Sequence, residues 1–343
     1  MKLPRPLLLF TTGLALVVIV FGAYVRLSDA GLGCPDWPGC YGHPSPWHAA
    51  ERIAAALDAD PLGPVSHAKA WKEMLHRYLA GGLGVSILLI GILAWLRLPP
   101  ARRVLPAALL GLVTFQALLG MWTVTQQLKP MVVAAHLLGG MTTLALLVWL
   151  LLRERPTSIT ARAPVPLARG LLLLVLAQIA LGGWVSANHA ALVCPDFPTC
   201  QGVWWPPADF AGGFGLAHSL GGLDVLALTA IHLSHRVGAL LVLLFALWLV
   251  ARLADVSAAA AAWLLGIVSA QFLLGVANVL LGLPLPVAVA HNAGAAALLS
   301  CLVWINVRLA TRSPGHPRSD PPPAAAGSGV LSEPGVHFTR RTP

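Results

Sequence analysis

The chain has 343 residues, of which 57% are hydrophobic and only 10% are charged, and it carries a formal net charge of +9. Globular proteins carry about a quarter charged residues, so this supply cannot cover a water-exposed surface of that size. The composition excludes a soluble protein, and with it a nucleic-acid-binding interpretation of the pI near 10.0. The lipid bilayer is therefore the expected environment.

Apolar runs long enough to cross a bilayer occur eight times along the chain. A helix needs about 20 such residues to span the hydrocarbon core. The expected spans are Leu7–Val25, Trp71–Leu96, Val104–Val124, Met131–Leu152, Gly170–Ser186, Ala230–Val250, Ala258–Leu281 and Val287–Leu309. The pattern predicts an all-α integral membrane protein whose first span is an uncleaved anchor.

Basic residues predict the orientation of these spans. On the side of the amino terminus lie 15 of the 22 Lys and Arg residues, with 7 on the other side. Cytoplasmic loops of membrane proteins carry an excess of Lys and Arg. We therefore expect a multi-pass protein of the inner (cytoplasmic) membrane with both termini cytoplasmic. Two long loops, about 27–70 and 187–229, then face outward. Residues 313–343 have the composition of a disordered cytoplasmic tail.

Matched features indicate that the chain is a tandem repeat. The motif Cys34-Pro-Asp-Trp-Pro-Gly-Cys40 returns 160 positions later as Cys194-Pro-Asp-Phe-Pro-Thr-Cys200. The other pairs, at offsets of 155 to 160, are Gly22 with Gly182, His76-Arg77 with His235-Arg236, Gln116 with Gln271, Gly120 with Gly275, and His136 with His291. We therefore expect two pseudo-symmetric parallel four-helix bundles, formed by residues 1–155 and 156–312.

Each even-numbered span carries one histidine of a matched set, at similar depths near the outer surface: His76, His136, His235 and His291. A lone histidine there is usually an interfacial or packing residue, but four in register favour a functional site. Paired imidazoles between apolar helices fit haem iron. Zinc fits less well, because two histidines per half leave it short of ligands.

The residue three positions before the first histidine differs between the halves. Glu73 precedes His76 on the same helix face, whereas His232 precedes His235. We interpret the difference as one half holding a reacting ligand and the other a permanent one. The alternative is that Glu73 simply pairs with Lys72 or Arg77.

The cysteine pairs Cys34/Cys40 and Cys194/Cys200 lie on the outer, oxidising side, where disulfides are permitted. Each pair encloses two prolines and can turn back on itself. Both a structural staple and a redox role remain open.

The strings Gly31-Leu-Gly-Cys-Pro-Asp-Trp-Pro-Gly-Cys-Tyr41 and Glu73-Met-Leu-His-Arg77, with the remaining single histidines, resemble the haem A synthases over residues 5–310. Two departures are Ser28-Asp29-Ala30 and an insert at about 42–68. The resemblance implies oxidation of a methyl group of haem O to the formyl group of haem A. Haem O synthase, cytochrome oxidase assembly factors and a second copy of the chain are the partners it suggests.

The same resemblance implies a role for each candidate residue. His76 and His136 would ligate haem O with Glu73 assisting, and His235 and His291 would hold a permanent haem b. Arg77 and Arg236 would pair with haem propionates, while Cys34 and Cys40 act in or support the substrate site. Because two histidines fill both axial positions, one substrate-side histidine must be displaced, or oxygen must act elsewhere.

Two other functions compete with this interpretation. A di-haem b-type electron carrier or quinol oxidoreductase would use similar histidines, but transmembrane transfer favours haems stacked through the bilayer, and all four histidines lie on one side. A transporter would also suit parallel repeats, but its helices are usually broken near the midplane.

Overall fold

The computed structural model describes residues 2–153, 164–215, 222–310 and 342, and within these ranges every regular element is a helix. Eight helices are long and apolar enough to cross a membrane: α1 (Arg5–Leu27), α3 (His67–Arg97), α4 (Pro100–Thr125), α5 (Pro130–Arg153), α6 (Val165–Ala187), α8 (Val225–Ala254), α9 (Ala258–Leu280) and α10 (Leu285–Ala310). The prediction of an all-α protein with eight spans is confirmed. The junction at 155/156 and the tail at 313–343 lie outside the described residues.

Several helices begin earlier than hydropathy predicted, among them α3 and α8, which each carry a histidine of the matched set. The Ser66 hydroxyl caps α3 by accepting a hydrogen bond from the Lys69 amide (3.2 Å), and the Asp224 carboxylate caps α8 through the Ala227 amide (2.8 Å). Ser and Asp are favoured N-cap residues because they satisfy amides that the first turn leaves free. His76 and His235 therefore lie more than two turns inside their helices rather than about one.

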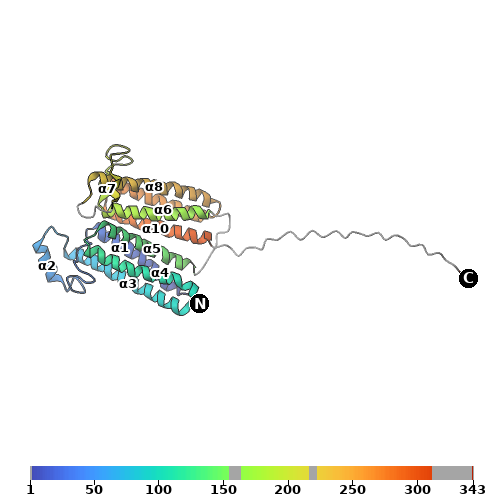
Figure 1. Ribbon diagram of the computed structural model, residues 1–343, viewed down its shortest axis with the longest axis horizontal. Helices are drawn as coiled ribbons and strands as arrows, with labels where there is room; N and C mark the ends of the chain where they lie inside the picture. The colour runs from blue at the N-terminus through green and yellow to red at the C-terminus, as the bar shows by residue number, and fades with distance from the viewer. Residues whose placement is uncertain (1, 154–163, 216–221, 311–341, 343) are drawn as a thin grey trace.

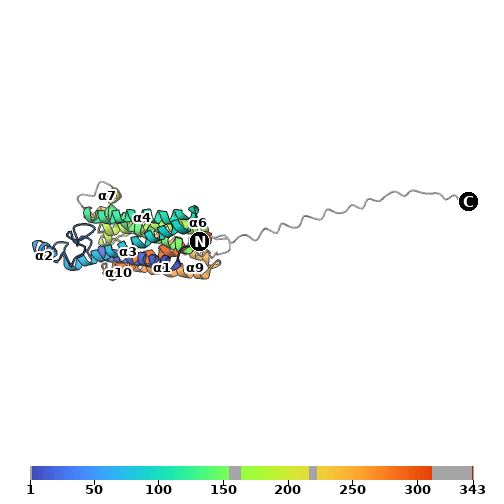
Figure 2. The ribbon, with the colours of Figure 1, turned by 90° about the horizontal axis from the view of Figure 1, so that it is seen from below.

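The helices run side by side along one axis, with short elements gathered at one end. Figure 1 shows α2 (Ala50–Ala59) and α7 (Phe210–Phe214) at the end opposite the amino terminus, and Figure 2 shows the same separation from below. The first expected outer loop contains α2, and the second contains α7 and the short 3₁₀ turn η1 (Ala190–Leu192).

Helix contacts form two closed rings. In the first, α1 and α4 each pack on both α3 and α5; in the second, α6 and α9 each pack on both α8 and α10. The rings meet where α5 contacts α6 and α10, and where α1 contacts α10. Consequently α3 lies diagonally across from α5, and α8 lies diagonally across from α10.

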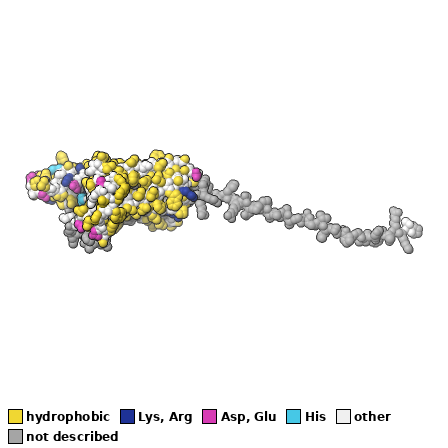
Figure 3. Space-filling view, turned by 90° about the horizontal axis from the view of Figure 1, so that it is seen from above, with side chains coloured by type: hydrophobic (Ala, Val, Ile, Leu, Met, Phe, Trp, Pro, Cys, Tyr) yellow, Lys and Arg dark blue, Asp and Glu magenta, His cyan; other side chains and the backbone are white. Residues whose placement is uncertain are grey.

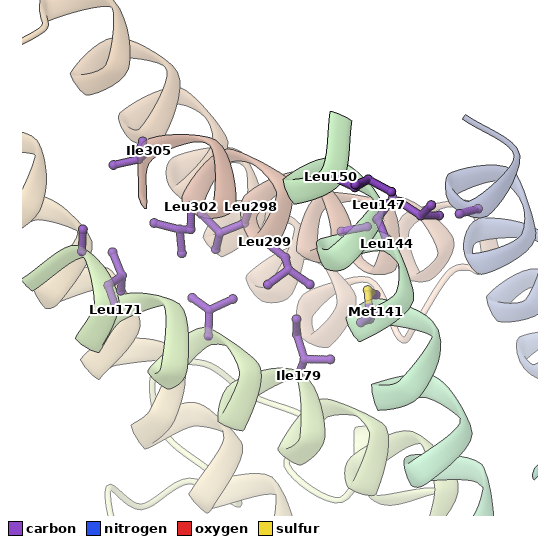
Figure 4. Packing of buried hydrophobic residues seen from close by; sticks show 14 of the residues in the cluster. Met141, Leu144, Leu147, Leu150, Leu171, Ile179, Leu298, Leu299, Leu302 and Ile305 are labelled. Carbon is purple, nitrogen blue, oxygen red and sulfur yellow. The ribbon is translucent and has the colours of Figure 1, made fainter. Parts of the chain in front are cut away.

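Buried aliphatic side chains fill the region where the rings meet. Figure 4 shows Met141 of α5, Ile179 of α6 and Leu299 of α10 among the side chains that point toward one another there. Between lipid-exposed helices, close van der Waals packing replaces the hydrophobic driving force that water would supply. On the face shown in Figure 3, the surface between the two ends is mainly apolar, and charged groups cluster toward the ends.

The two cysteine loops have the same internal design. Disulfides join Cys34 to Cys40 and Cys194 to Cys200, with Cα atoms 4.9 and 4.6 Å apart. In the second loop the Asp196 carboxylate accepts hydrogen bonds from the Thr199 hydroxyl and from two following amides. These bonds, the Thr199 bond foremost, lower the pKa of Asp196. In the first loop Asp36 accepts in the same way from the Tyr41 and Gly42 amides.

In each half an arginine binds the cysteine loop through several of its backbone carbonyls. Arg236 donates to the carbonyls of Thr199 (2.7 Å), Asp196 (2.7 Å) and Cys194 (3.1 Å). Arg77 donates to the carbonyls of Asp36 (2.8 Å), Pro38 (3.3 Å) and Gly39. The planar, forked guanidinium suits such convergent acceptors. Both arginines, expected at haem propionates, are thus bound to loop backbone in this structure.

Replacing Arg236 with alanine should therefore loosen the second cysteine loop. Hydrogen bonds from a charged donor are worth about 1.5–3 kcal/mol each, and we expect the free energy of unfolding to fall by about 2 kcal/mol or more. The melting temperature in detergent and protease cleavage within residues 187–215 would measure the effect. The control is Arg252→Ala, an exposed position at the far end of the same helix; equal melting temperatures for the two variants would contradict the arginine's role.

Candidate functional site

One large cavity, of about 1930 Å³, extends between the helices of both rings. Its lining includes the four predicted histidines: His76, His136, His235 and His291. Glu73, Arg77 and Arg236 also border it. The structure thus brings together site residues that are spread over more than 200 positions of sequence.

Each histidine ring packs against a glycine on a neighbouring helix. A Cβ atom built on Gly22 of α1 would lie only 2.7 Å from His76 Cε1, and one on Gly182 of α6 would lie 3.1 Å from His235 Cε1. The same holds for Gly120 with His136 (3.4 Å) and Gly275 with His291 (3.2 Å). Small residues permit this close approach between membrane helices. The glycines of the repeat therefore leave the space that each imidazole occupies, which we call its glycine seat.

The histidines form one pair in each ring. His76 of α3 lies within electrostatic reach of His136 of α5, and His235 of α8 lies within reach of His291 of α10. Because α3 and α5 are diagonal, as are α8 and α10, each pair faces across the interior of a ring. A flat ligand held between two such imidazoles would be enclosed by four helices.

This donor set fits haem. The porphyrin supplies four ligands in its plane, so its iron needs axial imidazoles only, and apolar helices cover the porphyrin faces. The tight seat that the Gly22 and Gly182 contacts provide would fix the direction of each ring. Within the described ranges, no group of three or more His, Cys, Asp or Glu side chains lies close enough to hold a metal ion.

Glu73 lies at the junction of the cavity and the first cysteine loop. Its side chain is buried, and its two carboxylate oxygens accept hydrogen bonds from the Cys34 amide (2.9 Å) and from Arg77. The predicted alternative partner Lys72 instead lies over the ring of Tyr24, 4.9 Å from its centroid. At the corresponding place in the second ring, His232 Nδ1 donates to the Ala190 carbonyl (2.9 Å). Both side chains bind a loop, one as acceptor and the other as donor.

A cross-link at the rim between the two halves escaped the sequence analysis. Arg26, at the end of α1, donates to the Ser186 carbonyl (3.1 Å) and lies 3.1 Å from His189 Nε2. Burial, with the nearby Arg26 charge second, lowers the pKa of His189, so the neutral ring accepts this bond at pH 7. In the sequence, the only sign of this contact was that Arg26 is a basic residue next to the outer end of a span. Its hydrogen-bond partners, Ser186 and His189, belong to the other half.

Three glutamines on the cavity wall were also missed as site residues. Gln116 and Gln271 stood out in the sequence only as markers of the repeat, and Gln178 did not stand out at all. Each lies beside one of the histidines and borders the cavity.

Comparison with known proteins shows what the chain is similar to. The family model described as cytochrome oxidase assembly protein (COX15-CtaA) matches residues 5–303. A protein of Shewanella oneidensis named heme A synthase is 44% identical over 313 residues, covering 88% of this chain and 94% of its own. Proteins of the same name from Methylobacterium radiotolerans and Rhizorhabdus wittichii are 33% and 29% identical, each over 340 residues; the alignments cover 89% and 88% of this chain and 89% and 94% of the relatives.

The glycine seats can be tested with alanine substitutions. At Gly22 the added methyl group would collide with the His76 imidazole, and at Gly182 it would crowd the His235 imidazole. We therefore expect each variant to retain less haem per chain, with Gly22→Ala the more severe. Absorption spectra of the purified proteins would measure this. Gly13→Ala in α1 and Gly170→Ala in α6 are matched controls, since a Cβ at either meets nothing within 4 Å. Normal haem content in Gly22→Ala would show that the seat does not matter.

Proposed function

The chain belongs to the COX15-CtaA family of cytochrome oxidase assembly proteins, and we propose that it is a haem A synthase, a membrane oxidoreductase acting on haem O. One observation supports this most directly. Two pairs of imidazoles face across two rings of apolar helices within one cavity, an arrangement suited to holding two haems rather than one.

We assign haem O to the first half, residues 1–155, between His76 and His136. Haem b would occupy the second half, residues 156–312, between His235 and His291. The assignment rests on Glu73, a carboxylate that borders the cavity one turn from His76. The second half carries an imidazole, His232, at that place. When bound, the haems supply the redox chemistry, which amino acid side chains alone lack.

The residues of the chain then bind, orient and shield the substrate. The four histidines would provide the axial ligands, and the apolar wall would admit an isoprenoid-tailed substrate sideways from lipid. Glu73 is held by Arg77 and by the Cys34 amide, so its carboxylate stays fixed beside the site. Trp37, Pro38 and Gly39 of the first cysteine loop border the cavity, and this loop would limit the access of water to the substrate.

The disulfides and arginines act in this proposal through the loops. Cys34–Cys40 and Cys194–Cys200 would be structural staples, while Arg77 and Arg236 fix those loops over the cavity. With both termini cytoplasmic in the inner membrane, the loop end of the molecule would face outward. Haem O synthase, which would supply the substrate, and oxidase assembly factors, which would take the product, are the proposed partners.

Conversion of haem O is the decisive test of the activity. Expressed with a haem O producer, the intact chain should yield haem A among the extracted porphyrins. His235→Ala should remove the tightly bound haem b from the purified protein, because its iron would lose an axial ligand. Tightly bound haem without any haem A would instead favour the di-haem electron carrier.

Substitutions at Glu73 test its part in the reaction. Glu73→Ala should leave haem b bound but reduce haem A formation by about 100-fold, within the range of a positioned acid–base group. Glu73→Gln retains an oxygen that can accept from the Cys34 amide but removes the charge. Full activity in Glu73→Gln would reduce Glu73 to an anchor of the loop, and full activity in both variants would overturn the assignment.

A further inference from the structure

Glutamine side chains contact the imidazoles of the cavity unequally. The Gln178 side-chain nitrogen of α6 lies 3.0 Å from His235 Nδ1 and donates to the His235 carbonyl (2.8 Å). Gln116 of α4 reaches His136 in the same way once its amide is turned by a half turn, the orientation that its neighbours favour: its nitrogen then lies 2.9 Å from Nδ1 and 3.1 Å from the carbonyl, with its oxygen accepting from the Gly140 amide. Each glutamine therefore links the imidazole of a histidine to the backbone carbonyl of that same histidine.

A glycine makes room for each of these amides. It stands three residues after the histidine, so that a Cβ on Gly139 or Gly238 would overlap Gln116 or Gln178. Gln271 lies against Gly294 in the same manner, although its nitrogen approaches His291 Nε2 only to 3.5 Å. Glutamine and glycine thus form a clamp at Nδ1 of two histidines, His136 and His235, and a looser contact with the other ring nitrogen of His291.

His76 has no such clamp. The clamp residue Gln178 stands one turn before Gly182, and the residue one turn before Gly22 is Val18. Three residues after His76 stands Leu79 rather than glycine. His76 Nδ1 is buried, and no hydrogen bond reaches it from the part of the chain that the structure describes. His291 Nδ1 is likewise buried without a partner among the described residues, but Gln271 reaches the other nitrogen of that ring, whereas no glutamine lies beside His76.

The difference matters for an axial ligand. A histidine that binds metal through one nitrogen usually donates its other N–H to a partner, which fixes the ring and raises its basicity. A glutamine amide can hold the imidazole in either tautomer. Rotating the amide by a half turn presents either its oxygen to a protonated Nδ1 or its N–H to an unprotonated Nδ1. Without a partner, His76 would be a weaker ligand than His136.

We propose that His76 is the exchangeable axial ligand of the substrate haem, while Gln116 and Gln178 are positioning residues that keep His136 and His235 bound. This inference rests on the proposed function, and it answers which substrate-side histidine gives way. The imidazole leaves the iron with its own electron pair, so the exchange needs no oxidant, and one axial position becomes open to a small molecule on the His76 side.

Exchanging the clamp between the halves tests the proposal, with carbon monoxide as the probe of an open axial position. Val18→Gln/Leu79→Gly would build the clamp at His76, and Gln178→Val/Gly238→Leu would remove it at His235. Each exchange is made in full-length protein with one haem site only: the first in His235→Ala/His291→Ala, the second in His76→Ala/His136→Ala. The readout is the affinity of the reduced, haem-loaded protein for carbon monoxide.

We expect the unmodified first half to bind carbon monoxide at least 10-fold more tightly than the unmodified second half. Building the clamp should weaken binding about 10-fold, and removing it should strengthen binding about 10-fold, in line with the effect of such partners on metal affinity. Leu79→Gly alone is the matched control and should change affinity less than 2-fold. Equal affinities of the two halves, or no response to the clamp with haem retained, would overturn the proposal.

If an exchange variant fails to fold, single substitutions test the role of the clamp instead. Gln178→Val should open His235 to carbon monoxide, and Gln116→Val in the first-half background should speed haem loss about 10-fold; no change in either would count against the clamp. Absence of bound haem from the unmodified protein would instead refute the proposed function.

Discussion

The close contact between an imidazole and a glycine on the neighbouring helix is the constraint on which the site depends. Helices in lipid gain no hydrophobic free energy by associating, so their approach is set by packing and by small residues. At Gly22 the ring of His76 occupies space that a Cβ would fill. This contact directs the imidazole into the interior of the helix ring, and its three equivalents do the same for the other histidines.

The fold was largely predictable because lipid permits few alternatives. Backbone polar groups must be satisfied within each span, so length and hydropathy locate the helices. The histidines and their glycines were visible as repeated residues, yet their contacts were not, since those depend on how each helix is rotated. The early starts of α3 and α8 were readable from Ser66 and Asp224, but a search for apolar runs passes over capped polar turns.

Comparison of the halves explains which site residues the sequence concealed. A repeat reveals what two copies share, and Gln116 with Gln271 was found in that way. Gln178 escaped because its counterpart is Val18, so a difference between the copies left no matching pair to notice. Arg26 escaped for another reason: it binds Ser186 and His189 of the opposite half, and no spacing within one half predicts that contact. The loop-facing direction of Arg77 and Arg236 likewise depends on how the cysteine loops fold back.

Three of the differences between the two halves lie close to one pair of corresponding histidines. The helix pairs α4–α5 and α9–α10 carry the same glutamine, histidine and glycine set, from Gln116 and His136 to Gln271 and His291. Among the differences between the pairs α1–α3 and α6–α8, three change the polar or small residues close to the histidine: Val18 against Gln178, Glu73 against His232, and Leu79 against Gly238. All three surround a single pair of corresponding histidines, His76 and His235. In the proposed function, the part that the two halves share would hold a haem alike in each, and the differences around His76 and His235 would decide which haem can lose a ligand.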